Sequence, residues 1–74
     1  MNTLYEVQQL LKRFGIFVYL GERLLDLEIM EAEIKDLYFS SLIDKEDLHK
    51  ALSIIRNEIN IEKNRKKSGE ENGK

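Results

Sequence analysis

The sequence predicts an all-α protein, a small three-helix up-down-up bundle with a disordered C-terminal tail. Apolar residues recur every three or four positions over three stretches of the chain, which is the helical period. Proline is absent, so nothing interrupts these stretches, and the short connections between them make successive helices neighbours. We expect the bundle over residues 1–62, with helices at about 4–14, 22–40 and 45–62, and a flexible charged tail over 63–74.

Thr3 and Glu6 mark the start of the first helix. The Thr3 hydroxyl can accept from the backbone N–H of Glu6, and the Glu6 carboxylate can reach back to the cap. Gly15 is suited to the left-handed position that ends a helix, with Ile16 folding back onto Leu11. One face of this helix is apolar and carries Leu4, Val7, Leu10, Leu11 and Phe14.

The segment IFVYL, residues 16–20, connects the first helix to the second. It is short, rich in β-branched and aromatic residues, and has no strand to pair with, which indicates an extended or irregular connector. In an extended chain successive side chains alternate, so we expect Ile16, Val18 and Leu20 to face the bundle.

The same alternation turns Phe17 and Tyr19 the other way. Two arrangements remain open for these rings. They either cover Leu25 and Ile29 as a structural lid, or stand exposed between arginines as a platform on which a flat group stacks.

The second helix begins after Gly21, with Glu22 in its first turn, where the helix dipole favours an acidic residue. Leu25, Ile29 and Ala32 form a second apolar strip, roughly opposite the main face, that needs a cover. The main apolar face of the helix carries Leu24, Leu27, Met30, Ile34, Leu37 and Tyr38.

Asp44 is placed to cap the third helix, and Glu46 and Asp47 add negative charge to its first turn. The segment after residue 62 contains no apolar residue and cannot bury anything, which predicts the tail. The inner face of the third helix carries Leu48, Ala51, Leu52, Ile55 and Ile59.

Composition excludes several classes of function. There is no cysteine, which excludes disulfides and thiolate metal sites, and His49 is the single histidine. The acidic face at Glu28 and Glu31 is expected to be solvated, with Lys35 beside it. No apolar run suits a secretion signal or a membrane span. We therefore expect a cytoplasmic protein without catalytic activity, cofactor, metal or membrane contact.

Several motifs resemble a known family. These are VQQLLK, the two-glycine segment FGIFVYLGER, and a pattern in the second helix. Over about residues 3–58 the chain closely resembles the YqgQ-like family of small bacterial proteins. The resemblance implies a helical bundle and implies no particular activity. Ser41 stands in the turn between the second and third helices in place of a glycine, which is a minor departure from the family pattern. The second-helix pattern consists of Met30, Glu31, Glu33, Ile34, Asp36, Leu37 and Tyr38.

Single-stranded nucleic acid is the leading ligand hypothesis. Tyrosine can stack on a base, glutamine can bond base edges, and basic side chains with free amides at a helix start can hold phosphate. The net charge of −2 opposes phosphate affinity. In the alternative interpretation Tyr5 lies over the third helix and the connector aromatics belong to the core. The arginines then pair with Glu6, Glu22 or Asp26. The candidate residues are Tyr5, Gln9, Lys12, Arg13, Phe17, Tyr19, Gly21 and Arg23.

A protein-interaction role is the alternative function. The strip of Leu25 and Ile29, together with Ile54 and Ile61 on the third helix, is more apolar surface than one three-helix core can bury on one face. These residues would serve an adaptor that binds a protein partner, or self-association of the chain.

Overall fold

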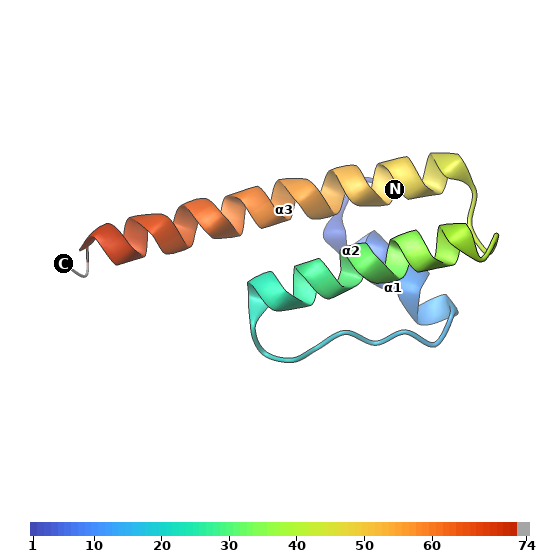
Figure 1. The fold of residues 1–74 in the computed structure, drawn as a ribbon, viewed down its shortest axis with the longest axis horizontal. Helices are drawn as coiled ribbons and strands as arrows, with labels where there is room; N and C mark the ends of the chain where they lie inside the picture. Colours follow the sequence, from blue (N-terminus) through green and yellow to red (C-terminus); the bar gives the residue numbers. More distant parts are fainter. Residues whose placement is uncertain (73–74) are drawn as a thin grey trace.

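The computed structural model describes residues 1–72, with side chains through Arg65. It contains three helices over that range, α1 (Leu4–Arg13), α2 (Arg23–Phe39) and α3 (Lys45–Asn72), each of which contacts the other two. The predicted all-α three-helix bundle is confirmed. Figure 1 shows α2 and α3 lying antiparallel, with α1 crossing behind them and the connector returning the chain along α2.

The starts of α1 and α3 are fixed by local caps, as predicted. The Thr3 hydroxyl oxygen accepts from the N–H of Glu6 at 3.3 Å. The Glu6 carboxylate accepts from the N–H of Asn2 at 2.9 Å, one residue before the expected partner. At the start of α3, Asp44 Oδ1 accepts from the N–H of Asp47 at 2.8 Å. Each cap satisfies an amide that the first turn of a helix leaves without a partner.

The end of α1 is the predicted left-handed glycine turn. Gly15 has a φ of 76°, and its N–H donates to the Lys12 carbonyl at 2.9 Å. The N–H of Ile16 donates to the Leu11 carbonyl at 3.0 Å, which completes a Schellman motif. The same motif ends α2 at a residue that is not glycine. Ser41 has a φ of 62°, and its N–H donates to the Tyr38 carbonyl at 2.9 Å.

The helix boundaries agree with the expected ones except at the end of α3. That helix continues past Glu62 to Asn72, well beyond the start of α2 (Figure 1). Glu62 itself is buried, with Arg65 Nη1 at 3.4 Å from its Oε1. The flexibility of residues 63–74 stays a prediction, and residues 73–74 lie outside the described residues.

The core is built from the apolar faces that the helical period identifies. It also includes Ile43, from the turn between α2 and α3. Leu4, Phe14, Leu24, Tyr38 and Leu48 pack against it as half-buried residues. The buried apolar side chains are Val7, Leu10, Leu11, Leu27, Met30, Ile34, Leu37, Ile43, Ala51, Leu52, Ile55 and Ile59.

The acidic face of α2 helps to hold α3. Glu31 Oε2 accepts from Arg56 Nε on α3 at 3.1 Å, and Lys35 Nζ lies 3.6 Å from the same oxygen. Glu31 therefore takes part in an interhelical contact as well as in a helical i,i+4 pair. Among the helices of residues 1–72, none is both long and apolar enough to cross a bilayer.

Candidate functional site

A groove lies where the connector passes α1 and α2. It consists of two adjoining hollows of about 270 and 250 Å³, and both are lined by Gln8, Val18, Tyr19 and Met30. We call the pair the connector groove. The first hollow is completed by Leu11, Lys12, Ile16 and Phe17. The second is completed by Leu4, Gly21, Arg23, Asp26 and Leu27.

The connector presents its two aromatic rings to solvent. Ile16 and Val18 are half-buried against the core, whereas Phe17 is 72% and Tyr19 88% exposed. The alternation predicted for residues 16–19 is therefore observed. Because the rings are this exposed, they are not a lid over α2, and Leu25 beneath the expected lid is itself 43% exposed.

The prediction that Leu20 packs against the bundle is wrong, since this side chain is 63% exposed. Its backbone N–H donates to Asp26 Oδ1 at 2.9 Å, and the next residue, Gly21, turns the chain with a φ of 83°. The position of Leu20 is therefore set by this hydrogen bond and by the turn that follows. The alternation of side chains typical of an extended chain ends at Tyr19.

Asp26 is the buried polar residue of the groove, a position that the sequence did not predict. It was expected as a surface partner for arginine, but it is only 8% exposed and lines the second hollow. The first turn of α2 favours its negative charge. A signal was present in the sequence: Asp26 directly precedes Leu27 and stands four residues before Met30, both in the core, so it borders the buried face.

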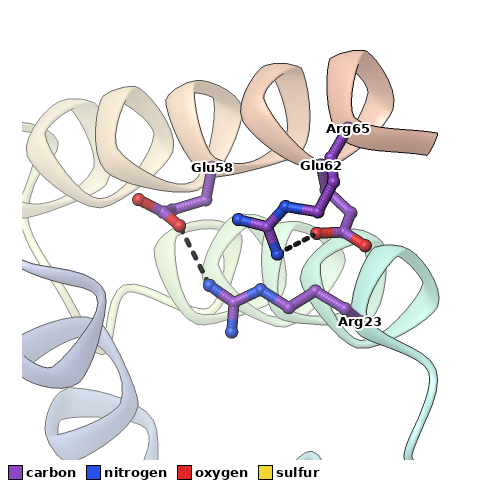
Figure 2. A network of polar contacts seen from close by, with 4 residues as sticks. All are labelled: Arg23, Glu58, Glu62 and Arg65. Carbon is purple, nitrogen blue, oxygen red and sulfur yellow. Dashed lines mark hydrogen bonds and ion pairs between the residues drawn. The ribbon is translucent and has the colours of Figure 1, made fainter. Parts of the chain in front are cut away.

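Arg23 lies at the same end of the groove. Its ion-pair partner is a residue of α3 and not a nearby acid of α1 or α2 such as Glu6 or Asp26. Its Nη2 lies 2.9 Å from Glu58 Oε1 on α3, a contact 35 residues apart in sequence. Figure 2 shows Arg23 reaching across to Glu58, with the Glu62 and Arg65 pair beside it. Arg23 is half exposed, so this pair contributes at most ~1 kcal/mol to stability.

The other predicted site residues fall into two groups. Lys12, Phe17, Tyr19, Gly21 and Arg23 line the connector groove. By contrast, Gln9 and Arg13 line a different hollow that also contains Glu6 and Asp47, so acidic groups surround them.

Tyr5 is exposed on α1 and lines neither hollow of the connector groove. Gln8, which was not among the candidates, lines both hollows of the connector groove. The groove thus collects five of the eight predicted residues, together with an amide and a buried carboxylate.

The residues proposed for protein interaction are only partly exposed. Leu25 and Ile61 are each 43% exposed, whereas Ile29 and Ile54 are half-buried and Ile54 packs against the core. Ala32, the last residue of the strip, is exposed.

The chemistry available in the groove is that of a binding surface. It combines apolar walls, two exposed rings, cationic side chains at both ends and one carboxylate. His49 lies elsewhere, exposed on α3. Over the part of the chain that the structure describes, no three histidine, aspartate or glutamate side chains are arranged to hold a metal ion.

These features define a small helical-bundle protein with an amphipathic surface groove. The YqgQ-like family model matches residues 1–61, which is most of the chain. The chain is also 48% identical over 64 residues to the uncharacterized protein YqgQ of Bacillus subtilis (strain 168), covering 86% of this chain and 90% of that protein. The chain therefore belongs to the YqgQ-like family.

Proposed function

We propose that the protein is a non-enzymatic binding module that takes single-stranded nucleic acid along the connector groove. The observation that carries this proposal is the exposure of Phe17 and Tyr19 beside the groove. Large aromatic rings are normally buried for their apolar area, and a base can stack on an exposed ring. Two such rings on one short segment favour a ligand made of successive flat groups.

An extended connector would space its two rings suitably for a base. Residues two apart in an extended chain lie roughly 6.6 Å from each other, at about 3.3 Å per residue. Stacked bases along one strand are separated by about 3.4 Å. In an extended backbone there is therefore room for one base between the side chains of Phe17 and Tyr19.

Cationic groups flank the apolar part of the groove. Lys12 lines the first hollow, is exposed, and has no ion pair within the described residues. Arg23 lines the second hollow and pairs with Glu58, which leaves further guanidinium donors for a phosphate oxygen. Two cations give modest affinity, and the acidic groups elsewhere on the chain lower it further.

Fluorescence anisotropy with short labelled DNA and RNA single strands tests this proposal. Tyr19→Ala should weaken binding about 5- to 150-fold, the range expected for loss of one stacked base. Phe39→Ala is the matched control, because Phe39 is a similarly exposed ring, at 77%, on the last residue of α2 and away from the groove. Lys12→Gln should reduce the slope of log affinity against log salt by about 0.7.

Three results would contradict the proposal. The first is the absence of binding at millimolar oligonucleotide and low salt. The second is equal loss in the Tyr19→Ala and Phe39→Ala variants, which would indicate a nonspecific aromatic effect. The third is an affinity that does not change with salt, since phosphate binding must weaken as salt rises.

Self-association is the second candidate, favoured by the partial exposure of Leu25 and Ile61. Apolar association holds or strengthens in strongly hydrated salts such as sulfate, the opposite of phosphate binding. Light scattering at high protein concentration measures it directly. A monomeric mass there, unchanged by Leu25→Asp, excludes self-association through this strip.

A further inference from the structure

We infer that the second hollow of the connector groove holds a guanine base, whose Watson–Crick N–H groups donate to the Asp26 carboxylate. This inference rests on the proposed nucleic-acid function and adds a base preference to it. It starts from an observation independent of the exposed rings, namely the buried carboxylate at the end of the groove.

Asp26 has hydrogen-bonding capacity that the described chain does not use. A carboxylate has about four lone-pair sites, and those that no protein group occupies can accept from a ligand. Within the described residues one hydrogen bond reaches it, from the N–H of Leu20 to Oδ1 at 2.9 Å. Asp26 lines a hollow of about 250 Å³, so a ligand there can supply the remaining donors.

The walls of the hollow suit a flat ligand that carries donors along one edge. Val18, Leu27 and Met30 supply apolar surface, and Tyr19 stands at the rim as a stacking ring. Gln8 adds an amide with both a donor and an acceptor. This combination of stacking and edge hydrogen bonding is how proteins read single-stranded bases.

Among the bases, guanine matches a carboxylate best. Its Watson–Crick edge carries two adjacent donors, N1–H and the N2 amino group, which can form parallel bonds to the two carboxylate oxygens. Adenine and cytosine offer one amino group next to an acceptor nitrogen, and thymine offers one N–H between two carbonyls. Those acceptors would face the negative charge of Asp26. The amide of Gln8 can donate to the O6 of guanine.

The test compares short thymine strands that carry one central guanine, adenine, cytosine, inosine or 7-deazaguanine. Wild-type protein should bind the guanine strand about 5- to 150-fold more tightly than the adenine strand, as expected for a bidentate pair. Inosine lacks the N2 amino group and should lose part of this preference. The 7-deazaguanine strand keeps the Watson–Crick edge and should bind like guanine.

Asp26→Asn is the informative variant. The asparagine oxygen can still accept from Leu20, but the negative charge and the second acceptor oxygen are lost. The guanine preference should disappear while affinity for an all-thymine strand is kept. Asp36→Asn, on the exposed side of α2, is the matched control and should leave the preference unchanged.

The possible failures are distinguishable. Tight binding that is equal for all strands overturns the guanine pocket and leaves the proposed function standing. No binding to any strand overturns both. A lysine-like ammonium is the competing ligand for such a carboxylate. If butylamine changes the NMR chemical shifts of Asp26 and no guanine preference is found, the inference is also overturned. If circular dichroism shows that Asp26→Asn does not fold, the inosine and 7-deazaguanine comparison on wild-type protein decides the question.

Discussion

Replacing Ser41 with glycine should raise the free energy of unfolding. Ser41 lies in the turn after α2 with a φ of 62°, in the left-handed region where a Cβ is strained. The Schellman bonds of this turn are backbone bonds, from Ser41 to Tyr38 and from Leu42 to Leu37, both at 2.9 Å. They do not depend on the serine side chain, which is exposed. Glycine therefore removes strain without removing a contact.

The size of the gain follows from two opposing effects. The left-handed conformation costs an L-residue ~1 to 2 kcal/mol, and glycine avoids this. Glycine also loses more conformational entropy on folding, which costs ~0.5 to 1 kcal/mol. The net stabilisation is about 0.5 to 1 kcal/mol, and for a chain of this size that raises Tm by roughly 2 to 8 °C.

Thermal and urea unfolding followed by far-ultraviolet circular dichroism measure the change. Ser40→Gly is the matched control, because the adjacent serine has a φ of −85° and a ψ of 3°, which any residue adopts. Glycine there should lower stability slightly through its entropy alone. A Ser41→Gly variant that is no more stable than wild type, or a Ser40→Gly variant stabilised to the same degree, would refute the strain at this turn.

Three further predictions concern other parts of the chain. Hydrogen bonding from Asn2, with smaller contributions from the N-terminal ammonium and Thr3, lowers the pKa of Glu6. The ionised Glu6 carboxylate therefore stabilises the fold above the ordinary pKa of glutamate, and this stabilisation is lost as the pH falls through the lowered pKa. Glu6→Gln should flatten this acid-side loss in a pH series of Tm, and an unchanged profile contradicts it. Ile55→Val should cost about 0.5 to 1.5 kcal/mol in urea unfolding, because Ile55 is fully buried, and no loss would indicate a loosely packed core. Asp26→Ala should cost about 1 to 3 kcal/mol and Asp26→Asn less, because only alanine leaves the N–H of Leu20 without an acceptor; equal losses argue against this role for the bond.

Those parts of the fold that local chemistry determines could be predicted from the sequence. Thr3 and Asp44 mark helix starts because a cap is made within three residues, and Gly15 marks an end for the same reason. The left-handed turn at Ser41 was harder to predict, since serine gives no conformational signal there. Its position is set by the backbone bonds that close α2 and by packing of the neighbouring Ile43 into the core.

The site was less predictable because its geometry depends on contacts distant in sequence. Alternation correctly gave the exposure of Phe17 and Tyr19, since it needs only an extended backbone. It failed at Leu20 because the bond to Asp26 overrides it. The pairing of Arg23 with Glu58 depends on the antiparallel packing of α2 on α3, which brings together residues that no local spacing relates.

The hydrogen bond between Leu20 and Asp26 also allows the opening of the connector to be measured. In the described structure no backbone partner is assigned to the N–H groups of residues 17–19, whereas the Leu20 N–H is held by a carboxylate. In deuterated water the amides of residues 17–19 should exchange rapidly, and that of Leu20 more slowly. The exchange rate of this single amide then measures how often the connector lifts from α2, with or without a ligand in the groove.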